Sequence, residues 1–104
     1  MISKFEFMGF LPNEELREKS NLALERLLDL APYGSIAVAL LEKTDVTYSC
    51  AIEIYSKQGP FSVRVTDARA EAVLEAAVRA LSRKLDQWKE LRRSANKLTE
   101  IRYL

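Results

Sequence analysis

The chain has 104 residues, enough for one domain with a real core; 48% of them are hydrophobic and 30% are charged. A single cysteine, Cys50, and the lack of histidine exclude an internal disulfide, a histidine-based zinc site and an imidazole base. No stretch approaches the ~20 apolar residues of a membrane span, and the opening MISKFEFMGF does not resemble a signal peptide, so we expect a cytoplasmic protein without membrane contact.

The first third of the chain predicts a strand and then a helix. In KFEFMGF, residues 4–10, Phe5 and Phe7 alternate with charged residues, as on a strand with one buried face. Asn13 is a suitable helix N-cap, and Pro32 and Gly34 end the helix that follows. The apolar residues of this helix recur at helical spacing: Leu16, Ala23, Leu24, Leu27, Leu28 and Ala31.

Three strands follow. GSIAVALLEK, residues 34–43, has apolar residues on both faces of the expected strand and therefore predicts a well-covered central strand. Short turns at Thr44-Asp45 and at Lys57–Pro60 join it to residues 46–56 and then to residues 61–66, so we expect an antiparallel meander. One face of the middle strand is formed by Val46, Tyr48, Cys50, Ile52 and Ile54.

The last element is a long helix. Thr66 or Asp67 is the expected cap, and ARAEAVLEAAVRALSRKLDQWKELRR, residues 68–93, holds strong helix formers without Gly or Pro. Arg92 comes next on the apolar stripe, so burial should stop near Trp88 and the rest of the helix should project beyond the sheet. The stripe consists of Ala70, Leu74, Ala77, Val78, Leu81, Leu85 and Trp88.

Together these elements predict an α+β fold over residues 1–94. It is a β-α-β-β-β-α sandwich in which a four-stranded sheet carries two helices on one face. Residues 95–104 form a C-terminal extension or tail with apolar residues at Leu98, Ile101 and Leu104. This tail extends the helix, folds back on the domain, or meets a partner.

The net charge of +1 hides an uneven distribution. Residues 1–60 hold six Lys/Arg against nine Asp/Glu, a net charge of −3, whereas residues 61–104 hold ten against six, a net charge of +4. Residues 79–102 alone hold eight against three, a net charge of +5. Such a basic end indicates a polyanionic or acidic partner; the alternative is a solvated helix face held by internal ion pairs.

The sheet face away from the helices is expected to carry Met8, Ala37, Ala39, Leu41, Ala51 and Tyr55, which is less polar than a solvated face requires. It therefore indicates a homo-oligomer formed through this face, an edge strand or the tail; the alternative is a tolerated apolar surface. One aromatic, Tyr55, is too few for a sheet that stacks single-stranded RNA.

Catalytic chemistry is not expected. Cys50 lies on the apolar side of its strand and should be a buried, inert thiol. Glu42, Asp45 and Glu53 occupy turn or outer-face positions, where solvated carboxylates are ordinary. No Gly-rich phosphate loop, CxxC pair or GxSxG elbow occurs, so we expect no enzyme, no metal and no cofactor.

The order of elements and one spacing resemble a known family. V-x-x-L-x-x-x-L-x-x-W-K, from Val78 to Lys89, resembles the last helix of the ribosome hibernation-promoting factors, above all the short single-domain forms called ribosome-associated inhibitor A. EELREKSNLALERLLDLAP and LLEKTDVTYSCAIEI resemble the first helix and the middle strands of the family, so the resemblance spans residues 3–93. The matching positions in the last helix are Val78, Leu81, Arg83, Leu85 and Lys89.

The resemblance implies a non-enzymatic factor that binds rRNA of the small ribosomal subunit, occludes the channel for messenger and transfer RNA, and represses translation under stress. The alternative is a divergent member that acts as a protein–protein interaction module without RNA binding. Where the family places basic residues, this chain has Ala80, Asp86 and Gln87. The expected phosphate contacts are Arg79, Arg83, Lys84, Lys89, Arg92 and Arg93, with Lys97 on the same outward side as Arg79.

Overall fold

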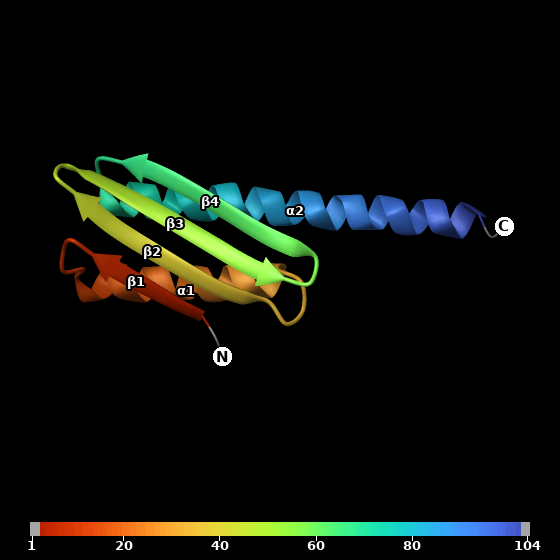
Figure 1. Cartoon of the computed structure of the whole chain (residues 1–104), viewed down its shortest axis with the longest axis horizontal. Helices are drawn as coiled ribbons and strands as arrows, with labels where there is room; N and C mark the ends of the chain where they lie inside the picture. The colour runs from red at the N-terminus through yellow and green to blue at the C-terminus, as the bar shows by residue number, and fades with distance from the viewer. Residues whose placement is uncertain (1–2, 103–104) are drawn as a thin grey trace.

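The computed structural model describes the backbone of residues 3–102 and the side chains of residues 4–94. Two helices cover one face of a four-stranded sheet, and the predicted α+β architecture is confirmed (Figure 1). The elements are β1 (Ser3–Met8), α1 (Glu14–Leu30), β2 (Ile36–Thr44), β3 (Thr47–Ser56), β4 (Gly59–Asp67) and α2 (Ala70–Arg102).

The sheet is mixed. Its spatial order is β1-β2-β3-β4; β1 pairs in parallel with β2, and the other two pairs are antiparallel. The predicted meander of β2, β3 and β4 is therefore confirmed. The parallel pair needs a crossover, and α1 supplies it by packing over the sheet between the two strands.

Helix α1 begins and ends where the sequence predicts. The Asn13 side chain accepts a hydrogen bond from the backbone N–H of Leu16 at 2.8 Å, which satisfies one of the free donors of the first turn. At the other end the N–H of Ala31 donates to the carbonyl of Leu28. The one buried polar side chain among the described residues, Ser20, donates to the Leu16 carbonyl at 2.7 Å, so its burial leaves no unpaired hydroxyl.

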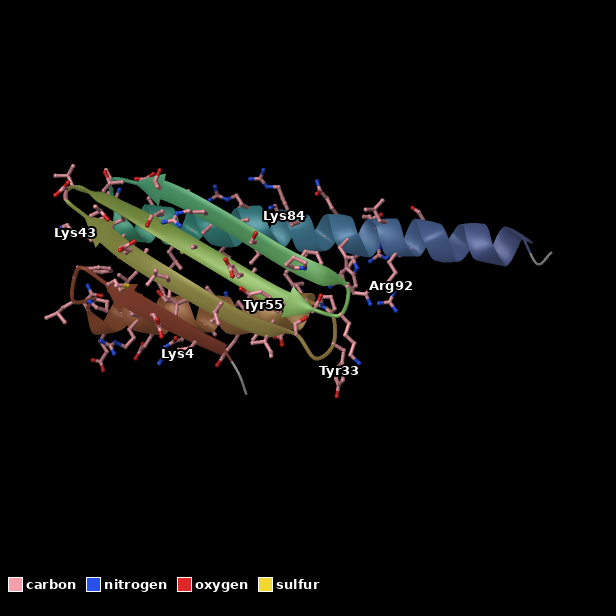
Figure 2. The ribbon with its side chains drawn as sticks, viewed as in Figure 1. Lys4, Tyr33, Lys43, Tyr55, Lys84 and Arg92 are labelled. Atoms are coloured by element: carbon pink, nitrogen blue, oxygen red, sulfur yellow. The ribbon has the colours of Figure 1, made fainter. Side chains whose placement is uncertain are left out.

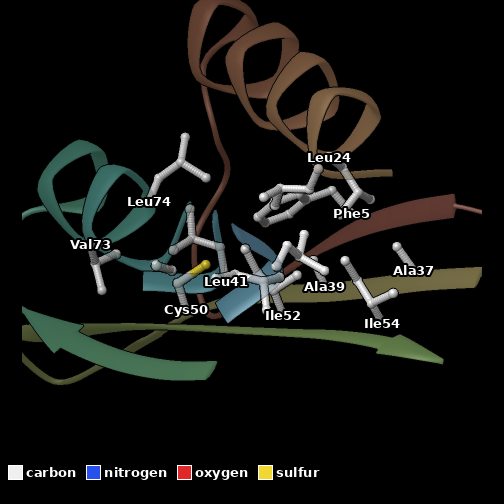
Figure 3. Close-up of a cluster of buried hydrophobic side chains, with 14 of the residues drawn as sticks. Phe5, Leu24, Ala37, Ala39, Leu41, Cys50, Ile52, Ile54, Val73 and Leu74 are labelled. Atoms are coloured by element: carbon white, nitrogen blue, oxygen red, sulfur yellow. The ribbon is translucent and has the colours of Figure 1, made fainter. Parts of the chain in front are cut away.

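The orientation predicted for β2 is wrong. Ala37, Ala39 and Leu41 face the helices and are buried, whereas Ile36, Val38 and Leu40 lie on the other face of the sheet. The core side chains around these positions are shown in Figure 3. Two observations explain the inversion. The two-residue turn to β3 holds Asp45 and Val46, and the resulting register pairs Leu41 with Cys50, so Leu41 shares the buried face of Cys50. Small alanines are needed there because Ala39 lies beside the ring of Phe5 on β1, under Leu24 of α1 (Figure 3).

Helix α2 starts two residues later than predicted, at Ala70, because Thr66 and Asp67 are still part of β4. Asp67 accepts a hydrogen bond from the backbone N–H of Arg69 at 3.2 Å in the turn before the helix, so it shapes the entry without being the cap. The predicted stripe packs on the sheet, joined by the buried Val73. No helix of the described part of the chain is long and apolar enough to cross a membrane.

Beyond the sheet α2 continues as a projecting rod (Figure 1). The helix passes residue 94 without a break and runs to Arg102, so the first residues of the tail extend the helix. The longest dimension of the molecule is 59 Å, against 26 and 20 Å for the other two. The side chains of Lys97, Leu98, Ile101 and Leu104 lie outside the described ones, and the division of the chain at residue 94 stays a prediction.

Candidate nucleic-acid interface

The point where α2 leaves the sheet is marked by Trp88. Leu85, one turn earlier, is fully buried, and Trp88 is half-buried with its ring edge-on to Phe61 of β4, the two centroids 6.1 Å apart. One turn further on, Leu91 is 72% exposed. Burial therefore ends at Trp88, as the sequence predicts.

Three basic residues gather around this tryptophan. Lys89, Arg92 and Arg93 line a shallow hollow together with Trp88, and we refer to these four residues as the Trp88 cluster. The Arg92 guanidinium lies 5.7 Å from the centroid of the Trp88 ring, a cation–π arrangement. Figure 2 shows Arg92 at the place where the helix departs from the sheet.

The internal partners of these cations are weak. Arg93 pairs with Glu90 at 3.2 Å, and both side chains are about 70% exposed. Such an exposed pair contributes ~0–1 kcal/mol, and an exposed cation–π contact contributes about 0.5–1 kcal/mol. A phosphate oxygen can therefore replace either partner at little cost, because a guanidinium–phosphate contact is charge-assisted and often bidentate.

The other three predicted contacts do not join this cluster. Arg79 and Arg83 are exposed and one helical turn apart; Arg79 lines a groove with Lys19 and Ala23 of α1. Lys84 points to the edge of the sheet, where its ammonium donates a hydrogen bond to the Ser62 carbonyl of β4 at 2.6 Å (Figure 2). The six residues are thus spread around α2 instead of forming one patch.

Two acidic residues of α2 near these cations, Asp86 and Glu90, differ in whether they form an ion pair. Glu90 pairs with Arg93. Asp86 is exposed, and among the described side chains no basic group lies within 4.0 Å of its carboxylate. The Trp88 cluster therefore holds three positive charges, of which Arg93 alone forms an ion pair among the described side chains.

Sequence reasoning missed two features of this end of the molecule. Tyr33, in the connection between α1 and β2, is fully exposed and lies at the same end as Arg92 (Figure 2). Lys57, in the two-residue turn before β4, is exposed as well. The signal for Tyr33 is a large aromatic between Pro32 and Gly34, where no strand or helix can bury it.

The residues considered for catalysis show no shared site. Cys50 is fully buried, and burial raises the pKa of its thiol from the ordinary 9.0 to about 12. Glu53 accepts a hydrogen bond from the Tyr55 hydroxyl; this bond, and then the carboxylate charge, raises the pKa of Tyr55. Among the described residues, no three His, Cys, Asp or Glu side chains gather as a metal site requires.

Known structures share this fold. The N-terminal domain of Protein Y from Thermus thermophilus is similar with a TM-score of 0.71 and 19% identity, over 85% of this chain and 99% of that one. A ribosomal subunit interface protein from Coxiella burnetii is similar with a TM-score of 0.70 and 12% identity, over 86% of this chain and 99% of that one. No protein-family profile and no curated protein match the sequence. The resemblance to the hibernation-factor family is therefore confirmed at the level of the fold.

Proposed function

We propose that this protein is a non-enzymatic, cytoplasmic factor of the hibernation type that binds rRNA of the small ribosomal subunit. By filling the channel for messenger and transfer RNA it would repress translation in idle cells. One of the two similar structures is itself a ribosomal subunit interface protein, and both are covered over 99% of their length, which supports the proposal without extending to the RNA contacts.

The Trp88 cluster is the observation that carries the proposal. It places three cations with weak internal partners at the root of a helix that projects from a rigid body. A folded rRNA surface is lined with phosphates, and neutralising them releases counterions without any need to read bases. Tyr33, at the same end, adds an exposed ring on which an unpaired base can stack.

Arg79 and Arg83, which lie outside the Trp88 cluster, would contact phosphates separately from it, because both are exposed on α2. Lys84 contributes only after it releases the Ser62 carbonyl. Because Ala80, Asp86 and Gln87 replace basic residues of the family, we expect fewer phosphate contacts than in a more basic member, and so weaker binding with a shallower salt dependence.

Sucrose-gradient sedimentation with purified small ribosomal subunits at low salt tests the proposal. We expect the wild-type protein to sediment with the subunits and the triple variant K89Q/R92Q/R93Q to remain largely at the top. The control R17Q/R26Q/K43Q removes the same charge from exposed residues outside the cluster and should still co-sediment. A wild-type protein that stays at the top of the gradient would overturn the proposal.

A protein–protein interaction module remains the second candidate, because the sheet face away from the helices exposes Ile36, Val38 and Tyr55. Salt separates the two candidates. Binding to rRNA should weaken steeply between low and moderate ionic strength, whereas burial of apolar surface should be little affected.

A further inference from the structure

The sheet face opposite the helices, here the open face, has an apolar centre. Ile36, Val38 and Leu40 follow one another along β2, and Tyr55 and Ala51 are the cross-strand neighbours of Ile36 and Leu40. The exposed fractions of Ile36, Val38, Tyr55 and Met8 lie between 38% and 52%. This continuous strip differs from the set predicted from the sequence, because β2 presents its larger residues to solvent.

Charged residues border the strip in a regular way. Glu6 on β1, Leu40, Ala51 and Arg64 on β4 lie at one level across the sheet, and Lys4, Val38, Glu53 and Ser62 lie at the next. Between these two levels the face is hollowed by about 410 Å³. Opposite charges therefore stand on opposite edges: Glu6 at the β1 edge and Arg64 at the β4 edge of the same level.

The charges of this face are poorly matched within one molecule. Among the described side chains, Arg64 has no carboxylate within 4.0 Å. Lys4 pairs only with Glu6, at 3.5 Å, and these two side chains are 77% and 59% exposed. Glu6 and Arg64, at the two edges of the sheet, can therefore both contact a partner outside the molecule.

We propose that the open face binds a second copy of this chain in a symmetric dimer. The two sheets face each other, and the two-fold axis lies between them, parallel to the strands and midway between β2 and β3. This axis places β1 over β4 of the second copy and β2 over β3. At one level Glu6 then meets Arg64 of the second copy, twice per dimer, and Leu40 lies over the small Ala51. At the next level Lys4 reaches Glu53 of the second copy. The pattern is self-complementary in both charge and volume.

The size of the face makes this dimer weak. Four strands ~4.8 Å apart and four levels ~6.7 Å apart cover roughly 400–500 Å² per copy, against ~800 Å² per partner in a standard interface. The dimer should therefore form only at high protein concentration. Both helices lie on the other face of the sheet (Figure 1), so the dimer leaves α2 uncovered and does not depend on the proposed RNA binding.

Sedimentation equilibrium tests the dimer, with protein from about 10 µM to about 1 mM. The wild-type mass should rise above the 11.9 kDa of one chain as the concentration increases. R64E places a carboxylate against Glu6 of the second copy and should weaken the dimer about tenfold or more, as should E6R. The double variant E6R/R64E exchanges the two charges and should restore dimerisation.

R26E is the matched control, because Arg26 is exposed on α1, away from the open face. It should dimerise like the wild type. Three results would overturn the proposal: a mass of 11.9 kDa at every concentration, a double variant as weak as the single ones, or an equal loss in R26E. Circular dichroism spectra identical to the wild type establish that each variant is folded.

Discussion

From Ala70 to Leu85, α2 buries a residue at every third or fourth position under the sheet, whereas from Leu91 on, the described side chains of the same helix are exposed. Both halves are rich in helix formers, and Arg92 lies on the same stripe as Leu81 and Leu85. The stripe stops being core where α2 passes the end of the sheet, and the same point is marked in the sequence by Arg92 in place of an apolar residue. The packed half fixes the direction of the helix, and the projecting half is free to hold charge.

The largest expected difference between the halves is in stability. Leu81→Ala leaves a cavity in the core and should lower the free energy of unfolding by about 2–5 kcal/mol, because Leu81 is fully buried. Leu91→Ala makes the same change on the projecting half, where the side chain is 72% exposed, and should change it by less than ~0.5 kcal/mol. Urea denaturation followed by circular dichroism measures both. Equal losses would mean that the two halves are not packed differently.

The packed body also predicts a loss of stability at high pH. The pKa of Cys50 is about 12 in the folded chain and 9.0 when the thiol meets water, so the folded state holds the proton more tightly. The stability that this provides is complete below pH 9 and is lost as the pH rises toward 12. Between pH 9 and pH 12 the free energy of unfolding should fall more steeply with pH in the wild type than in Cys50→Ala. The variant lacks the thiol but keeps every lysine and tyrosine, so the difference between the two pH profiles is due to Cys50. Parallel pH profiles would contradict the burial of Cys50.

The smallest expected effect concerns the projecting half. Glu90→Gln removes the one acidic partner of Arg93 in an exposed pair, so the free energy of unfolding should change by less than ~1 kcal/mol. Affinity for small ribosomal subunits should rise about two- to fivefold, because a negative charge leaves the phosphate-facing side. Glu25→Gln on α1, an exposed position with the same charge change, should leave that affinity unaltered. A lower affinity in Glu90→Gln would show that Glu90 positions Arg93 for binding.

The fold could be predicted from the sequence wherever one residue type marks a position. Asn13 defines the start of α1, and the alternation of Lys4 and Glu6 with Phe5 and Phe7 defines the buried face of β1. Strand β2 offers no such mark, because Ile36, Ala37, Val38 and Ala39 are all apolar. Its orientation depends on the turn at Asp45, whose φ of 53° sets the pairing with β3, and on the room that Phe5 needs beside Ala39.

The candidate site could be predicted in part. The helical period correctly indicated where burial ends and which basic residues are exposed beyond that point. It could not indicate that Lys84 is held by the Ser62 carbonyl, since this contact joins residues 22 positions apart. Nor could it place Tyr33 at the end from which α2 projects, because that depends on how α1 and β2 are arranged in space.

The salt dependence of binding to small ribosomal subunits tests the RNA contacts of the Trp88 cluster most directly. The logarithm of the binding constant should fall linearly with the logarithm of the salt concentration, by about 0.7–0.9 per phosphate contact. We expect the slope of K89Q/R92Q/R93Q to be smaller than that of the wild type by about two to three. Identical slopes for the two proteins would mean that these three cations contact no phosphate, and would contradict the account.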